Sequence, residues 1–248
     1  MPARFFVDAP LSADASLALP PGPARHAQVL RLQPGAEITL FDGRGGEFAA
    51  SVTQMGRGEV RVQVGAHDPV QRELARPVTL ALGMPANERM DTLVEKATEL
   101  GVAVIAPLVC ERSVLRLHGE RAEKKRAHWR GVAIAACEQC GRTRIPALSP
   151  VAALPAWLAS LPPSGISTRW LLSLADDAPA LALVQAVAAL ADPHAPVWVL
   201  SGPEGGLSPD EEAAAIGCGF TPVGLGPRVM RADTAPLAVL AFLGLRAA

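Results

Sequence analysis

Residues 197–212 read VWVLSGPEGGLSPDEE, and this stretch decides the class of the fold. An apolar run that predicts a buried strand leads directly into a glycine-rich turn. Ser208, Pro209 and Glu211 then predict the start of a helix, with a serine N-cap, a proline in the first turn and a glutamate that completes a capping box. A strand that passes through glycines into a helix N-terminus is typical of open α/β sheets, whose ligands bind at this edge.

The chain from residue 77 onward repeats this alternation of strands and helices. Apolar segments typical of strands lie at 77–84, 102–110, 169–175, 196–202 and 221–226, and the clearest helical patterns lie at 87–101 and 121–141. We therefore expect an α/β domain over residues 73–248, built on a covered and mostly parallel sheet.

The first part of the chain has a different pattern. Residues 37–55 predict two strands joined by a glycine-rich hairpin turn, and residues 59–67 alternate polar and apolar side chains as a half-buried strand does. A short helix is expected within 24–35, where a Pro-Gly pair ends it. These elements predict a compact β-barrel domain over residues 1–72.

Composition narrows the class of protein. Half of the 248 residues are hydrophobic, 19% are charged and the net charge is −1, which suits a globular protein with a sizeable core. No apolar run approaches the ~20 residues of a membrane span, and the N-terminus lacks the pattern of a secretory signal, so we expect a cytoplasmic protein. Basic residues outnumber acidic ones nine to three within residues 112–144, which indicates either an anionic polymer as partner or a solvated helix face.

The four cysteines do not predict a disulfide framework in a chain of this size. Cys137 and Cys140 form a CxxC motif. Neither of the other cysteines has a close Cys or His neighbour that could supply the second ligand pair of a zinc site. We therefore expect no metal and interpret the motif as two small helix residues.

The glycine loop at 202–206 matches neither of the two common nucleotide-binding motifs. A P-loop needs a lysine and a serine or threonine after its last glycine, and a dinucleotide site needs G-x-G-x-x-G; both patterns are missing. Glu204 and the acidic residues at 210–212 would also repel a phosphate group. The loop is therefore either a site for another kind of ligand or a plain turn whose glycines fix the backbone.

A second candidate site follows within GLGPRVMRADTAPLAVLAFLG, residues 224–244. Between an apolar strand and an apolar helix it carries Arg228, Arg231, Asp233 and Thr234. Packing does not need these side chains, because a buried arginine costs free energy unless it is paired or used. A structural ion pair of Arg231 with Asp233 is the competing interpretation.

These segments resemble the signature of the SPOUT-class methyltransferases, and more closely that of the RsmE family, which methylates N3 of a uridine in 16S ribosomal RNA. The resemblance rests on GPEGGLSPDE and LGPRVMRADTA, continues in ERMDTLVEKATELGV and CEQCGRTRIP, and reaches the start of the chain in RFFV and HAQVLRLQPGAEITLFDG. It implies an N-terminal PUA-like β-barrel that binds RNA and a C-terminal parallel sheet whose chain is tied in a deep trefoil knot. It also implies a homodimer that acts on 16S rRNA or the small ribosomal subunit, with S-adenosylmethionine as cofactor. That cofactor is cationic and carries no phosphate, so a carboxylate in the loop is reasonable.

The resemblance also assigns roles to residues. The cofactor-binding positions are Leu172, Ser173, Leu200, Gly202, Pro203, Glu204, Gly205, Gly206, Leu225, Gly226, Val229, Met230, Arg231, Thr234 and Ala235. The residues expected to act in the reaction are Arg231, Arg228, Glu204 and Glu138. The arginines would stabilise negative charge on the uridine, and the two glutamates are alternative proton acceptors. RNA contacts are expected from Arg4, His26, Arg31 and Gln139.

The chain departs from the family pattern at two places. The family commonly has a lysine soon after the first strand of the catalytic domain, whereas residues 83–90 contain none, so one expected active-site or RNA contact is missing. Asp233 stands where the family often has glutamate. The alternatives are a non-catalytic RNA-binding factor for ribosome assembly on the same fold and a nucleotide hydrolase. The intact glycine loop and Arg231 favour the methyltransferase over the first, and the missing P-loop lysine disfavours the second.

Overall fold

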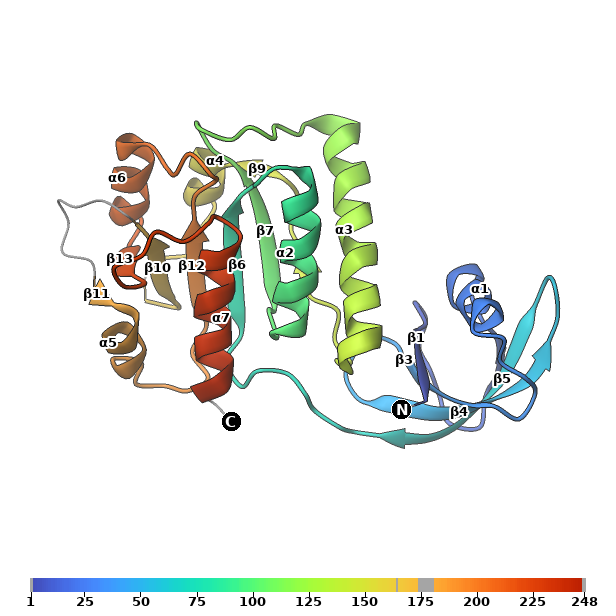
Figure 1. Cartoon of the computed structure of the whole chain (residues 1–248). Helices are drawn as coiled ribbons and strands as arrows, with labels where there is room; N and C mark the ends of the chain where they lie inside the picture. Colours follow the sequence, from blue (N-terminus) through green and yellow to red (C-terminus); the bar gives the residue numbers. More distant parts are fainter. Residues whose placement is uncertain (1, 164, 174–180, 247–248) are drawn as a thin grey trace. The chain divides into compact units, whose positions relative to one another are not determined.

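The computed structural model describes residues 2–163, 165–173 and 181–246. They form two compact units, which are described separately (Figure 1). The small unit comprises Met1–Glu73 together with Ile134–Ile145, and the large unit comprises Leu74–Ala133 and Pro146–Ala248. No sequence pattern predicts that residues 134–145 belong with the first part of the chain.

The small unit is a five-stranded sheet, ordered β1-β3-β4-β5-β2, with one helix. Its elements are β1 (Ala3–Phe6), β2 (Ser16–Ala18), α1 (Pro21–Val29), β3 (Glu37–Phe41), β4 (Glu47–Met55) and β5 (Val60–Asp68). The predicted hairpin is confirmed, because β3 and β4 pair antiparallel. Alternate valines of β5 at 60, 62 and 64 point into a core that includes Phe5 and Ile38, as the alternating pattern predicts. The patterns do not predict β1, which runs parallel to β3.

An arginine–glutamate cluster fixes residues 134–145 within the small unit. Arg4 donates from Nη1 to Glu47 at 2.7 Å and from Nη2 to the carbonyl of Gly141 at 3.1 Å. Arg72 donates to the same two groups at 2.7 and 3.0 Å. Burial raises the pKa of Glu47, but the hydrogen bonds from Arg72 and Arg4 outweigh burial and hold that pKa below its usual range.

The large unit contains an eight-stranded sheet, ordered β11-β13-β10-β12-β6-β7-β8, with β9 paired to β7. Its strands are β6 (Val78–Gly83), β7 (Val104–Val109), β8 (Ala147–Leu148), β9 (Ala152–Ala153), β10 (Thr168–Leu172), β11 (Leu181–Ala182), β12 (Val197–Ser201) and β13 (Thr221–Gly224). The recorded strand pairs are all parallel, so the predicted α/β fold is confirmed. The strand predicted at 169–175 ends at Leu172, and its last two residues lie outside the described residues.

Helices cover both faces of this sheet. They are α2 (Asn87–Glu99), α3 (Gly119–Cys140), α4 (Leu154–Ala159), α5 (Leu183–Ala188), α6 (Pro209–Gly217) and α7 (Thr234–Arg246). Ala81, Leu200 and Leu171 lie in register on neighbouring strands and share a core with residues of α4 and α6. Because side chains alternate along a strand, Leu80 and Val199 face the other side, where they are fully buried. We place α2 and α7, which contact each other, on that second face (Figure 1).

The helices of the large unit begin and end where local chemistry predicts. Gly101 has a φ of +92°, a left-handed conformation that stops the chain after α2 without a Cβ penalty. The helix of the small unit ends after Val29 in the same way, but there the left-handed residue is Arg31. Among the described helices, none combines the length and apolarity needed to cross a membrane.

Candidate active site

Three neighbouring strands, β10, β12 and β13, end side by side at the carboxyl edge of the large unit's sheet. β10 lies between β12 and β13, and its last residue, Leu172, pairs with Ser201 of β12 and Val223 of β13. The segments that leave these strands therefore start side by side, and they contain the cofactor-binding positions predicted at 172–173, 202–206 and 225–231. Ligands of parallel sheets bind at this edge. Leu200 lies just inside it, with its side chain fully buried in the core, so that only its backbone faces the loops.

The glycine loop after β12 is tightly folded against the rest of the sheet. A Cβ on Gly202 would lie 2.8 Å from the backbone nitrogen of Leu207, so only glycine fits. Gly206 has a φ of +71°, and its N–H donates to the carbonyl of Pro203 at 2.8 Å. Gly83, the last residue of β6, packs against the same loop, since a Cβ there would lie 2.5 Å from the nitrogen of Pro203. The glycines thus allow close backbone approach, as predicted, and Gly83 is a contributor that the sequence did not reveal.

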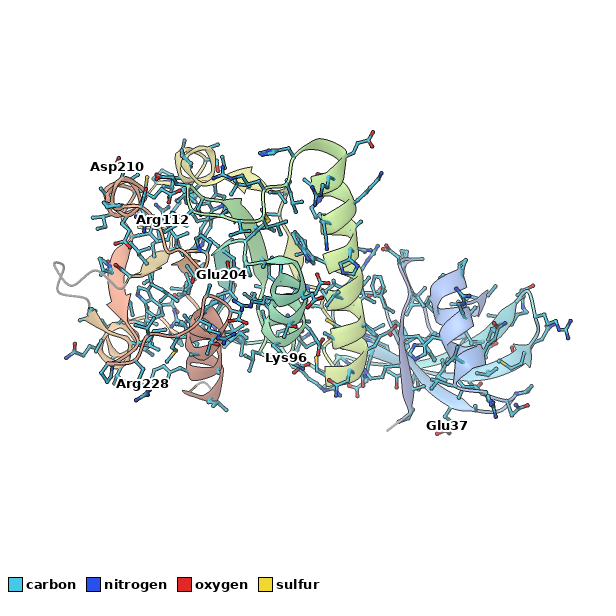
Figure 2. The ribbon with its side chains drawn as sticks, turned by 45° about the horizontal axis from the view of Figure 1, so that its top comes forward. Glu37, Lys96, Arg112, Glu204, Asp210 and Arg228 are labelled. Carbon is cyan, nitrogen blue, oxygen red and sulfur yellow. The ribbon has the colours of Figure 1, made fainter. Side chains whose placement is uncertain are left out.

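Hydrogen bonds to residues far away in the sequence hold this loop in place. Figure 2 labels Glu204 of the loop and Arg112, one of these partners. Glu204 Oε1 accepts the N–H of Ala86 at 3.0 Å and an Nη1 hydrogen of Arg89 at 3.4 Å. Arg112 donates to the carbonyl of Gly205 at 3.1 Å. The carboxylate of Glu204 therefore anchors the loop to the start of α2, and both arginines are additional site residues.

The acidic residues after the loop have structural partners. The predicted capping box of α6 is confirmed: Ser208 Oγ accepts the N–H of Glu211 at 3.4 Å, and Glu211 Oε2 accepts the N–H of Ser208 at 3.0 Å. The other oxygen of Glu211 accepts the N–H of Glu111 at 2.8 Å. Glu212 accepts the hydroxyl hydrogen of Ser173 at 2.7 Å, which connects the loop after β10 to α6. Glu211 and Glu212 thus connect α6 to the backbone of Glu111 and to Ser173, and these partners account for both carboxylates without a bound cation.

The loop after β13 presents its arginines to solvent. Arg228, Val229 and Arg231 are exposed, and Gly226 turns the chain with a φ of +98°. No ion pair joins Arg231 to Asp233 in the described part of the chain, so the competing structural interpretation is not supported. One oxygen of Asp233, Oδ1, is buried and has no hydrogen-bond partner among the described residues. The apolar helix expected after this loop is confirmed, and it begins at Thr234.

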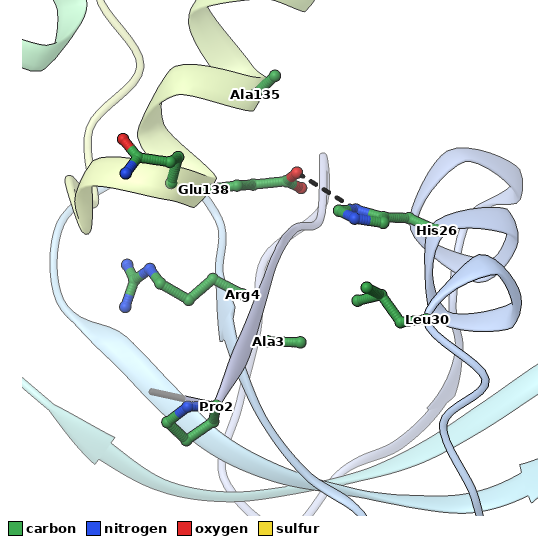
Figure 3. Close-up of a pocket in the computed structure, with 8 residues that line it drawn as sticks. Pro2, Ala3, Arg4, His26, Leu30, Ala135 and Glu138 are labelled. Atoms are coloured by element: carbon green, nitrogen blue, oxygen red, sulfur yellow. Dashed lines mark ion pairs between the residues drawn. The ribbon is translucent and has the colours of Figure 1, made fainter.

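The remaining predicted residues lie together in the small unit. Arg4, His26, Glu138 and Gln139 line one pocket (Figure 3). Arg31 lies outside it, two residues after the end of α1. Glu138, predicted as a possible proton acceptor, accepts the N–H of Phe6 at 2.9 Å. Burial raises the pKa of Glu138 above its usual value.

The CxxC motif lies near the end of α3, as predicted. Cys137 is fully buried against Phe6 and Phe41, and burial raises the pKa of its thiol to about 12. A thiol with that pKa stays protonated and unreactive at neutral pH. Across residues 2–163, 165–173 and 181–246, no cluster of three or more metal-ligating side chains is found.

Comparison with known proteins defines the class to which this fold and site belong. A family model described as an RNA methyltransferase domain matches residues 72–244. A second, described as an RNA methyltransferase PUA domain, matches residues 24–65. The large unit is thus of the RNA methyltransferase class, and the small unit carries its PUA domain.

Individual relatives narrow the class to one family. The chain is 33% identical over 219 residues to ribosomal RNA small subunit methyltransferase E of Mycobacterium bovis, an alignment covering 88% of this chain and 82% of the relative. It superposes with a TM-score of 0.88 and 35% identity on ribosomal RNA small subunit methyltransferase E of Neisseria gonorrhoeae bound to S-adenosyl methionine, covering 98% and 97% of the two chains. A Legionella pneumophila protein described as a methyltransferase with bound SAM matches with a TM-score of 0.90 and 32% identity, covering 99% and 98%. The chain belongs to the ribosomal RNA small subunit methyltransferase E family, which confirms the resemblance of its motifs.

Proposed function

We propose that this protein transfers a methyl group from S-adenosylmethionine to N3 of one uridine in 16S ribosomal RNA, in the cytoplasm. The observation that carries the proposal is the pair of folded loops at 202–206 and 225–231, on the strands that flank β10, in a chain of this family. The bound cofactor of two similar proteins supports S-adenosylmethionine. The uridine and its N3 atom follow from the resemblance of the motifs.

The residues of the two loops fit this cofactor. Glycine at 202 lets the loop fold closely on itself, and glycine at 206 allows its left-handed turn, so the loop can bring its backbone against a ligand. The side chain of Glu204 is 27% exposed, and its Oε2 receives no hydrogen bond from the described residues, so it can face a cation. When bound, S-adenosylmethionine would supply an electrophilic methyl group on its sulfonium, and the neutral thioether would be the leaving group. The chain itself then contributes alignment of the reactants and charge stabilisation.

We assign the chemical roles to side chains of the large unit. Arg231 and Arg228 are exposed and form no ion pair within the described chain, so both can stabilise negative charge on the oxygens of a deprotonated uridine. Glu204 is the proton acceptor in this proposal, because its Oε2 is unengaged beside the glycine loop. Glu138, the other candidate, belongs to the pocket of the small unit, where we assign it a binding role.

A homodimer is part of the proposal, and α7 supports it. Pro236, Val239, Leu240 and Leu243 are buried on one side of α7. The other side carries the apolar residues Leu237, Ala238, Ala241 and Phe242, all half-buried, and Leu245, which is 81% exposed. A helix that is apolar all round is normally buried, so a second copy of the chain would cover this side. Sedimentation velocity at micromolar concentration is expected to show a dimer, and a monomer would contradict this part. The trefoil knot also stays a prediction.

The decisive experiment compares Arg231→Ala with wild type in methyl transfer to small ribosomal subunits. Because Arg231 is exposed, the variant is expected to keep its melting temperature, while turnover falls by about 10²–10³-fold, as when a charge-stabilising donor is removed. Lys96→Ala, on the exposed surface of α2, is the matched control and should turn over like wild type (Figure 2). Unchanged turnover in Arg231→Ala would show that charge stabilisation in the reaction is assigned to the wrong residue.

The non-catalytic RNA-binding factor makes a different prediction. Such a protein would bind small ribosomal subunits without transferring label from radioactive S-adenosylmethionine, and Arg231→Ala would change nothing. Calorimetry with S-adenosylmethionine and with ATP separates the nucleotide hydrolase in the same way, because only the methyltransferase is expected to bind the first and ignore the second.

A further inference from the structure

The small unit contains a pocket of about 270 Å³, close to the smallest volumes that hold organic ligands. β1, α1 and the last turns of α3 supply its walls. Ala3, Leu30 and Ala135 are apolar lining residues, and Arg4, His26, Glu138 and Gln139 are polar ones. Figure 3 shows the Glu138 carboxylate pointing at the ring of His26, with Ala3 and Leu30 beneath them. A flat ligand with one polar edge fits such a site.

Only one of the two carboxylate oxygens of Glu138 accepts a hydrogen bond from the described residues in this pocket. Its Oε1 accepts the N–H of Phe6, while its Oε2 lies 3.7 Å from Nδ1 of His26, which is too long for a hydrogen bond. The side chain is only 17% exposed. An ionised carboxylate offers about four acceptor positions, so Glu138 has acceptor capacity left for a ligand. The pocket therefore selects a ligand with N–H donors on its edge.

The surface beside the pocket combines exposed apolar side chains with an exposed arginine. Val29 and Leu30 of α1 are 72% and 46% exposed. The next residue, Arg31, takes a φ of +55°, although the hydrogen bonds from Arg31 N–H to Gln28 and from Leu32 N–H to Ala27 form the helix end at which glycine is usual. This conformation is less favourable for an L-residue than for glycine. A cationic side chain kept at such a position is consistent with contact to an anion such as the RNA backbone.

Among the four RNA bases, guanine matches the carboxylate best. Its Watson–Crick edge offers two adjacent donors, N1–H and the N2 amino group, to one carboxylate. Adenine, cytosine and uracil each place an acceptor atom next to their single donor, and that acceptor would face the negative charge. Unpaired bases are commonly read in this way, by polar side chains at the base edge and by rings or apolar groups at its face.

We propose that this pocket binds an unpaired guanine of the RNA, with Glu138 accepting hydrogen bonds from its Watson–Crick edge and Ala3, Leu30 and Ala135 against its face. The inference rests on the proposed function, because it takes RNA as the ligand. It adds a base-specific site on the PUA-bearing unit.

The test is binding of the full chain to four fluorescent single-stranded RNAs, each an oligouridine with a central G, A, C or U. One well-placed bidentate contact discriminates bases by about 1–3 kcal/mol, so we expect the G oligomer to bind about 5–150-fold more tightly than the A oligomer. Glu138→Gln should remove this preference while leaving the all-U oligomer within about twofold of wild type. The amide oxygen of the variant can still accept the N–H of Phe6, so the fold is retained.

Two further variants make the result unambiguous. Ala135→Leu places a larger side chain in the pocket from an exposed helix position while leaving residue 138 a glutamate, and it should remove the guanine preference as well. Glu37→Gln, an exposed carboxylate on β3, is the matched control and should bind all four oligomers as wild type does. Equal binding of the four oligomers by wild type, or a guanine preference that survives both pocket variants, would overturn the inference. If guanosine monophosphate bound as tightly as the G oligomer, the ligand of the pocket would be a free nucleotide and not a base of the RNA.

Methyl transfer to small ribosomal subunits, measured in parallel, separates this inference from the proposed function. Methyl transfer without any guanine preference would refute only the proposal of a guanine site. A guanine preference without methyl transfer would refute only the proposed enzymatic activity.

Discussion

Substituting Gly83 with alanine tests whether the glycine loop must sit against the sheet to bind cofactor. Gly83 is the last residue of β6, and a Cβ at this position would lie 2.5 Å from both the nitrogen and Cδ of Pro203. It would also lie 2.9 Å from the carbonyl carbon of Gly202. Carbon atoms in contact are normally about 3.5–4.0 Å apart, so the loop would have to move by about 1 Å.

The size of the effect follows from that displacement. Inserting a methyl group into a packed site costs about 1–3 kcal/mol, and the atoms in the way are backbone and a proline ring, which cannot rotate aside. If the loop moves, the same free energy is lost from cofactor binding, which corresponds to about a 5–150-fold higher Kd. Turnover should fall further, because a misplacement of about 1 Å can cost about 10²-fold in rate.

Isothermal titration calorimetry with S-adenosylmethionine measures the effect, and thermal unfolding checks that the variant is folded. Gly131→Ala is the matched control, since a Cβ on this glycine of α3 meets no atom within 4 Å. It should leave the Kd unchanged and stabilise the helix by about 0.5–1 kcal/mol. A Kd for Gly83→Ala within twofold of wild type would refute the reasoning.

Three further substitutions test the fold and the RNA-binding unit. Ser208→Ala removes the capping box of α6 and should lower the free energy of unfolding by about 1 kcal/mol in urea titrations, whereas an unchanged midpoint would contradict the cap's role. Arg31→Gly relieves a left-handed arginine and should raise stability by about 0.5–1 kcal/mol while weakening RNA binding in anisotropy measurements; tighter binding would exclude an RNA contact. Glu47→Gln breaks the cluster with Arg4 and Arg72 and should cost about 1–3 kcal/mol at pH 7. Folding lowers the pKa of Glu47 from 4.5, so its contribution to stability is complete above pH 4.5 and disappears as the pH falls through the lower pKa of the folded state. The free energies of unfolding of wild type and Glu47→Gln should therefore converge at acid pH.

Local sequence patterns predicted most of the fold because each one reflects interactions between residues close together in the sequence. The alternation at 59–67 reflects one buried face of a strand, and the Ser-Pro-Asp-Glu start of α6 reflects unsatisfied N–H groups that the cap serves. Features that depend on distant partners could not be read in this way. β1 has only four residues and pairs with a strand more than thirty residues on, and residues 134–145 join the small unit through arginine contacts that span 137 residues.

The sequence singled out the glycine loop at 202–206 and the loop at 225–231 as candidate sites because their compositions do not suit a core, and the resemblance to the family assigned their roles. Arg89 and Arg112 were missed, since they reach the loop across 115 and 93 residues of sequence and nothing local distinguishes them from other surface arginines. Gly83 was missed for a similar reason, because the atoms that exclude a side chain there belong to Pro203 and Gly202.

The central claim is that this chain methylates N3 of a uridine in 16S ribosomal RNA. The most direct measurement is to incubate it with unmethylated small ribosomal subunits and labelled S-adenosylmethionine, and to identify the modified nucleoside by mass spectrometry after digestion. The account predicts one labelled nucleoside, N3-methyluridine, at a single position, and its loss in Arg231→Ala. Label in a different nucleoside, or no label in the presence of bound cofactor, would contradict it.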